Sequence, residues 1–227
     1  MGRKLITILT IIILTLSMTA CSDTKSELQT SIEPISKTEL FMGTAVKLTI
    51  YDKNDEEILD KAFNRIVEIE NLVSINKENT EINKLNENAG IGPVKLSEDS
   101  FNIIKTGIKY SEVSNGGYDI SIGPLVKLWN IGQVDAKVPS ESEINEAINK
   151  VDYSKVEINE ATKEVFLKEK GMLLDLGSIA KGYVADELVK LLKEEGVKEA
   201  IIDLGGNIYA LGKKSGTDNW KIGIQDP

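Results

Sequence analysis

An acidic residue that leads through a glycine into a helical pattern is the clearest place for chemistry in this chain of 227 residues. The short apolar run 172–174 has the composition of a buried strand and ends on Asp175. Gly177 and Ser178 interrupt the run, and a helical pattern follows them. The first N–H groups of a helix lack partners inside it, so this junction could hold a phosphate or another anion. Packing alone also produces such junctions, and the chain has neither P-loop spacing nor a GxGxxG dinucleotide fingerprint.

Two other places combine flexible backbone with side chains that could contact a ligand. Gly116 and Gly117 follow a predicted helix and precede Tyr118 and Asp119. Consecutive glycines let the backbone come close to a ligand or a strand, so a flat ring could stack on the tyrosine and donate a hydrogen bond to the acid. The alternative is a tight turn with Tyr118 in the core. Met42 is by default interpreted as a core side chain.

Composition limits the chemistry that the chain can perform. It contains no histidine, which excludes histidine-based acid–base catalysis and histidine-ligated zinc within this sequence. One cysteine, Cys21, permits no internal disulfide. The formal net charge of −9 argues against a nucleic-acid partner. It leaves a nucleotide ligand open, because a local pocket can be basic or lined by a metal.

The elements that must position these residues follow from the spacing of apolar side chains. Helical spacing predicts helices over residues 55–72, 97–113 and 139–151, and from Ile179 to a stop at Gly196. Residues 74–88 have the pattern of an asparagine-rich turn and a short helix. Apolar runs and alternation predict strands over residues 39–51, 197–204 and 219–225, and a hairpin from 155–159 and 164–167.

The first residues have the layout of a signal peptide. Arg3 and Lys4 precede an uncharged apolar run that is too short for a confident membrane span. Small residues before Cys21 resemble a bacterial lipobox; the alternative is an ordinary signal peptide followed by an accidental cysteine. We therefore expect a lipoprotein signal over residues 1–20 and a lipid on Cys21 that anchors the protein to the membrane on its extracytoplasmic side. A flexible tether over 21–36 would then lead to a domain over 37–227.

Four stretches behind this signal together resemble the ApbE family of FAD:protein FMN transferases, formerly called thiamine-biosynthesis lipoproteins. They are Met-Gly-Thr at 42–44, Gly-Tyr-Asp at 117–119 with Gly-Pro-Leu at 123–125, Asp-Leu-Gly-Ser-Ile-Ala-Lys-Gly-Tyr at 175–183, and Gly-Gly-Asn at 205–207. The resemblance implies an α+β domain related to the tunnelling fold, with a mixed or antiparallel sheet and packed helices. It implies Mg²⁺-dependent cleavage of FAD and attachment of FMN, through a phosphoester, to a threonine or serine of an extracytoplasmic flavoprotein such as a redox-pump subunit.

The resemblance also assigns roles to individual residues. Ser178 would offer its backbone carbonyl to the metal, and Asn76 stands where many members have a flavin-stacking tyrosine. The family places its remaining metal ligands beyond the strand that ends here at Gln225, so we expect a C-terminally truncated chain whose catalytic residues lie beyond Pro227. The implied FAD contacts are Met42, Asn76, Gly117, Tyr118, Asp119, Asp175 and Lys181.

Two other functions fit part of the sequence. A flavin-binding lipoprotein without catalysis is favoured by the expected loss of metal ligands. A solute-binding lipoprotein of a transporter needs two lobes that close on a ligand, and this chain is short for that.

Overall fold

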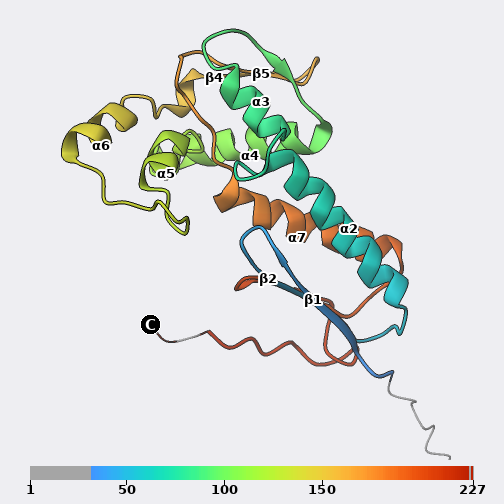
Figure 1. Ribbon diagram of the computed structural model, residues 1–227. Coiled ribbons are helices and arrows are strands. Elements are labelled where there is room, and N and C mark those ends of the chain that lie inside the picture. The colour runs from blue at the N-terminus through green and yellow to red at the C-terminus, as the bar shows by residue number, and fades with distance from the viewer. Residues whose placement is uncertain (1–31, 225, 227) are drawn as a thin grey trace, which may run out of the picture. The chain divides into compact units, whose positions relative to one another are not determined.

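Two antiparallel sheets and a set of helices build the domain. The computed structural model describes residues 32–224 and Asp226 (Figure 1). The first sheet has the order β1 (Ile35–Phe41), β2 (Thr44–Ile50), β6 (Ala200–Leu204), β7 (Asn207–Leu211), and the second has the order β3 (Val94–Lys95), β5 (Glu164–Leu167), β4 (Val156–Asn159). Every pair of neighbouring strands is antiparallel. The prediction of an α+β fold is confirmed.

Three long helices hold the domain together. They are α2 (Glu56–Val73), α4 (Glu98–Val113) and α7 (Gly177–Glu194), and they pack against one another while α2 and α7 also contact the first sheet. Figure 1 shows α2 and α7 running side by side. The shorter elements are α3 (Glu81–Glu87), α5 (Gly123–Trp129), α6 (Glu141–Ile148) and the 3₁₀ turn η1 (Tyr153–Lys155).

Side-chain caps fix where the predicted helices begin. Asp55 accepts a hydrogen bond from the N–H of Glu57 at the start of α2, and Ser97 caps α4 in the same way. Ser140 and Glu143 form a reciprocal capping box at α6. Each cap satisfies an N–H group that the helix itself leaves unpaired, which is why the predicted starts at residues 55, 97 and 139 lie within two residues of the observed ones.

The apolar faces of these elements meet in one core. It includes Leu48 of the first sheet, Ile66 of α2, Ile104 of α4 and Leu188 of α7, all fully buried. Burial of each such side chain stabilises the fold by roughly 1.5–3 kcal/mol relative to exposure. The core thus fixes α7, the helix that follows Asp175, against both α2 and α4.

The predicted strand over residues 39–51 is two strands. The chain reverses at Met42 and Gly43, whose φ angles are 52° and 72°, and β1 pairs with β2 from Phe41↔Thr44 to Ile35↔Ile50. The inward-facing positions shift by one residue across the reversal, from odd numbers in β1 to even numbers in β2. The continuous apolar run 40–42 hides this shift in the sequence, so the prediction missed the turn. β1 begins at Ile35, inside the stretch interpreted as tether. Cys21 and the predicted signal peptide lie outside the described residues.

Two predicted strands are wrong. Met172 and Leu174 are buried, but residues 172–174 make only one isolated bridge, between Leu173 and Ile122. Residues 219–224 form no strand in the described part of the chain. There Trp220 packs against Tyr51 and donates its indole N–H to the Leu211 carbonyl, so a side chain rather than a backbone ladder attaches the segment. No helix in the described ranges is long and apolar enough to cross a membrane.

An ion-pair network joins the three long helices. The guanidinium of Arg65 on α2 bonds both carboxylate oxygens of Asp99 at 2.8 and 2.6 Å, and Glu187 of α7 at 2.6 Å. The Tyr183 hydroxyl donates to Asp99 at 2.7 Å. Burial opposes ionisation of Asp99, but the hydrogen bonds from Arg65 and Tyr183 outweigh it and lower the pKa of Asp99 below its ordinary 3.8.

We predict that Arg65→Gln lowers the free energy of unfolding by about 2 kcal/mol at neutral pH, because it leaves two partly buried carboxylates without their cation. A group with a lowered pKa in the fold contributes stability above its unfolded pKa and loses it as the pH falls through the folded value. The difference between wild type and variant therefore shrinks below the ordinary Asp99 value of 3.8. Urea denaturation measured at several pH values tests this.

The matched control is Lys105→Gln, which breaks the exposed pair of Lys105 with Glu160. It is expected to change stability by at most about 0.5 kcal/mol. Equal effects of the two substitutions would contradict the role given to Arg65.

Candidate functional site

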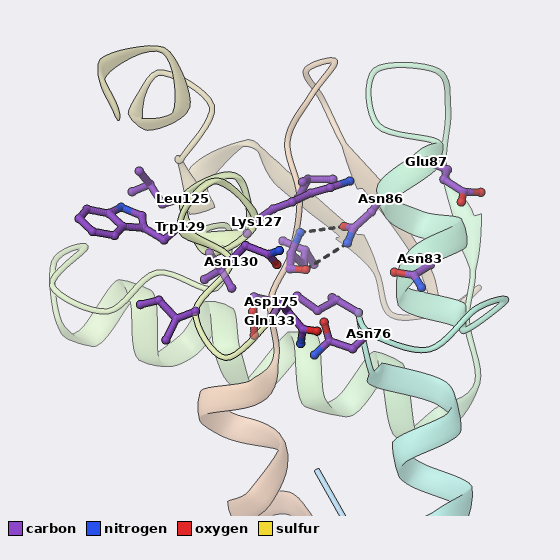
Figure 2. A pocket seen from close by; sticks show the side chains of 16 residues that line it. Asn76, Asn83, Asn86, Glu87, Leu125, Lys127, Trp129, Asn130, Gln133 and Asp175 are labelled. Atoms are coloured by element: carbon purple, nitrogen blue, oxygen red, sulfur yellow. Dashed lines mark hydrogen bonds between the residues drawn. The ribbon is translucent and has the colours of Figure 1, made fainter. Parts of the chain in front are cut away.

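A cleft lies beside the N-terminal end of α7. Its volume is about 820 Å³, and Figure 2 shows its walls, with α3 on one side and α5 and the loop after it on the other. A second cavity of about 400 Å³ continues from it toward the β1–β2 turn and shares Asn76, Gln133 and Asp175 with it. These volumes are in the range of small-molecule sites. The side chains that line the larger cavity include five amides, Asn76, Asn83, Asn86, Asn130 and Gln133.

Asp175 stands where the two cavities meet. Its backbone N–H donates to the Ile120 carbonyl at 2.9 Å, and its carboxylate accepts the N–H of Gly177 at 2.7 Å. A carboxylate is favoured at a helix N-terminus. One of the N–H groups that the sequence offered to a free anion, that of Gly177, is therefore already occupied by the protein. A phosphate bound here would face Asp175, so its binding requires a cation between them or beside them.

Lys181 supplies one positive charge at this point. It lies one turn into α7, lines the 400 Å³ cavity together with Asp175, and its ammonium is 3.5 Å from the Gly177 carbonyl. The spacing of four residues places Lys181 above Gly177 on the same helix face. Asp175 and Lys181 thus line one cavity, and a contact of either residue with FAD stays a prediction.

Met42 lines the same cavity, although it lies more than 130 residues before Asp175 in the sequence. The left-handed turn of the β1–β2 hairpin presents it, and its N–H donates to Glu70 at 2.6 Å. Lys77 binds the other oxygen of Glu70 at 2.6 Å. Met42 packs partly on the core and also lines the cavity. Asn76 lies exposed between the two cavities and offers an amide in place of an aromatic ring.

Ser178 and Tyr118 meet on the far side of the α7 start. Their hydroxyl oxygens are 3.0 Å apart, and both residues line a third cavity, of about 550 Å³, that Lys181 also reaches. Burial raises the pKa of Tyr118; the bond to Ser178 opposes this, and the charges of Asp175 and Asp119 add to it. The phenol therefore stays protonated at neutral pH and can donate a hydrogen bond.

Two of the predicted contact residues do not line these cavities. The carboxylate of Asp119 accepts hydrogen bonds from the Ser121 N–H and hydroxyl, both at 2.7 Å, and from the Tyr153 N–H at 3.0 Å. It thereby fixes the loop before α5 to the turn η1. Gly117 is exposed, and its N–H bonds the Ser114 carbonyl. A ligand contact of Asp119 or Gly117 stays a prediction.

Asn86 is a site residue that the sequence reasoning did not assign. Its amide donates to the Leu174 carbonyl at 3.1 Å and accepts from the Leu174 N–H at 2.7 Å, as the dashed lines in Figure 2 show. The signal was its position: Ile82 and Leu85 form the buried face of α3, and Asn86 follows Ile82 by four residues on that face. A polar residue on an apolar face indicates a specific partner.

The oxygen atoms near the α7 start decide whether the site could hold Mg²⁺. No group of three or more His, Cys, Asp or Glu side chains that could hold a metal occurs in residues 32–224. Near the α7 start, the cavity is lined by the Asp175 carboxylate, while the role of the Ser178 carbonyl as a metal ligand stays a prediction. Mg²⁺ commonly keeps several waters and binds through one or two carboxylates plus substrate phosphates. The described residues fit an ion shared with a pyrophosphate and do not form a complete protein cage.

Comparison with known proteins places these features in a family. The chain is 33% identical over 213 residues to the FAD:protein FMN transferase of Treponema pallidum, covering 86% of this chain and 59% of that protein. It is 35% identical over 192 residues to a protein of the same name from Klebsiella pneumoniae, covering 85% and 58%. The chain therefore spans less than two thirds of the length of these relatives.

Solved structures agree with the sequence comparison. The ApbE protein of Thermotoga maritima superposes with a TM-score of 0.79 at 26% identity, over 86% of this chain and 64% of that one. The flavin transferase ApbE of Vibrio cholerae, at 22% identity and the same TM-score of 0.79, shares the fold. The model of the ApbE family matches residues 42–227, and this chain therefore belongs to the ApbE family.

Proposed function

We propose that the protein transfers FMN from FAD to a threonine or serine hydroxyl of an extracytoplasmic flavoprotein, such as a redox-pump subunit, in a reaction that requires Mg²⁺. One observation carries the proposal. Three distant stretches of a chain of this family bring Met42, Asn76, Asp175 and Lys181 to one cleft at a helix N-terminus. Relatives at 33% and 35% identity bear the name FAD:protein FMN transferase.

The reaction breaks the phosphoanhydride bond of FAD. The acceptor hydroxyl oxygen forms the new bond to the FMN phosphorus, AMP leaves with the bridging oxygen, and the hydroxyl proton is released. Phosphoryl transfer depends mainly on positioning and on neutralisation of charge. Lys181 would neutralise part of the pyrophosphate charge, and Asp175 with the Ser178 carbonyl would hold the metal, which supplies further positive charge. The proton acceptor is not a histidine of this sequence.

A second function is supported by one observation. The described residues provide no cluster of three metal-ligating acids, so a flavin-binding lipoprotein without transfer activity is the alternative. For either function we propose that a lipid on Cys21 anchors the protein to the membrane with the domain on the extracytoplasmic side. Two acyl chains on one cysteine give much firmer anchoring than a single chain.

The first prediction concerns transfer itself. Incubation of the protein with FAD, Mg²⁺ and a threonine-bearing acceptor subunit is expected to leave gel-stable flavin fluorescence on the acceptor, and EDTA is expected to abolish it. An acceptor with the threonine replaced by valine is the control. FAD binding without any transfer would support the non-catalytic alternative, and failure to bind FAD would contradict both functions.

The second prediction concerns Asp175. Asp175→Asn keeps an oxygen that can accept the Gly177 N–H but removes the negative charge, so Mg²⁺-dependent FAD binding is expected to weaken roughly 10–100-fold. Fluorescence titration of FAD with and without Mg²⁺ measures this. The control is Asp186→Asn, an exposed residue of the same helix that lines none of the three cavities. An equal loss in both variants would rule out the role given to Asp175.

The third prediction concerns the anchor. Cys21→Ala is expected to move the protein from the membrane fraction to the soluble extracytoplasmic or secreted fraction, because the lipid attachment atom is gone. Cell fractionation followed by immunoblotting checks this, with wild type as reference. Retention of the variant in the membrane fraction would contradict lipid anchoring through Cys21.

A further inference from the structure

The segment that carries Asp175 forms hydrogen bonds on two sides. On one side its partners are backbone groups, and on the other the partner is a side chain. On the first side, the Gly123 N–H donates to the Leu173 carbonyl at 3.1 Å, and the Asp175 N–H donates to Ile120 at 2.9 Å. These bonds resemble those between neighbouring strands. On the second side, no strand of the described residues pairs with the segment. The side-chain amide of Asn86 forms the hydrogen bonds there instead.

The amide of Asn86 matches a backbone peptide group. It offers one donor to the Leu174 carbonyl and one acceptor to the Leu174 N–H, at 3.1 and 2.7 Å. Leu174 is fully buried. Loss of the Asn86 amide would leave two buried backbone groups without a partner, which proteins strongly avoid. A single side chain therefore satisfies the backbone of Leu174 on this side of the segment.

The helix that presents Asn86 is itself fixed. Thr80, almost completely buried, caps α3 by accepting the Asn83 N–H at 3.1 Å. Ile82 and Leu85 are fully buried in the core. α3 is thus attached to the core at both ends of its short length, and Asn86 extends from a rigid support toward the cleft (Figure 2).

We propose that Asn86 is a positioning residue that sets the location of the Asp175 carboxylate in the cleft by holding the backbone of Leu174. Asn86 acts on Asp175 through Leu174, the residue directly before it in the chain. A shift of the Leu174 peptide group would move the Asp175 carboxylate away from Gly177 and Lys181. The consequence for FAD rests on the function proposed above, whereas the bond between Asn86 and Leu174 does not.

Two substitutions separate the donor from the acceptor. In N86D the ionised carboxyl can accept the Leu174 N–H but cannot donate to its carbonyl; in N86L both bonds are lost. Burial and the Leu174 carbonyl raise the pKa of the carboxyl introduced in N86D. At lower pH this carboxyl becomes protonated and can again donate to the Leu174 carbonyl, which the leucine of N86L cannot do at any pH. FAD affinity is expected to fall about tenfold in both variants near pH 7 and to recover in N86D alone near pH 5.

The control for charge is N83D. Asn83 lines the same cavity, but its amide binds the Lys77 carbonyl and not the segment of Asp175. The cavity is also lined by three charged residues that the variants leave unchanged, Glu87, Lys127 and Asp175. Wild type is therefore measured at each pH, so that any effect of these residues on FAD affinity is subtracted. If N83D weakens FAD binding as much as N86D and recovers in the same way, the effect is one of charge and the proposal is overturned.

Amide hydrogen exchange of Leu174 gives a readout that does not need FAD. Relative to wild type at the same pH, exchange is expected to accelerate about tenfold in N86L and in N86D near pH 7, with protection returning in N86D near pH 5. Unchanged exchange in both variants would overturn the proposal. If wild type binds no FAD, the proposed function fails, and the exchange result alone still decides the role of Asn86.

Discussion

The pairing of buried backbone groups around residues 172–175 is the constraint on which the site depends. This segment crosses the domain between α3 and the loop before α5 without joining either sheet. Its polar groups are satisfied by Ile120 and Gly123 on one side and by a side-chain amide on the other. Buried peptide groups require such partners. The same bonds that make burial possible therefore also fix the carboxylate that ends the segment.

The helix that continues from this segment connects the site to the rest of the fold. The first turns of α7 carry Ser178 and Lys181 at the cavities, and the following turns carry Tyr183 and Glu187 in the network with Arg65. The ion pairs are half-buried, so their geometry is more restricted than that of exposed pairs. The helix α7 thus connects the cavity-lining residues Ser178 and Lys181 to α2 and α4.

Sequence predicted the helices well because caps such as Asp55, Ser97 and Ser140 act locally. The resemblance implied that Met42, Asp175 and Lys181 contact one ligand, and in the structure the three residues line one cavity. The strand predicted over residues 39–51 missed the reversal at Met42, because the apolar run 40–42 has no period of two and only the stretch 46–50 alternates clearly. One oxygen of Asp119 accepts from Ser121, two residues along the chain, whereas the other accepts the Tyr153 N–H across 34 residues, a contact that no local pattern encodes.

The amide-rich wall of the larger cavity has a consequence for its working conditions. The amides of Asn76, Asn83, Asn86, Asn130 and Gln133 neither gain nor lose protons in water. Histidine, the side chain whose ordinary pKa lies nearest neutrality, is absent from the sequence. Hydrogen bonds from these five amides would keep the same donors and acceptors when the surroundings become mildly acidic or alkaline.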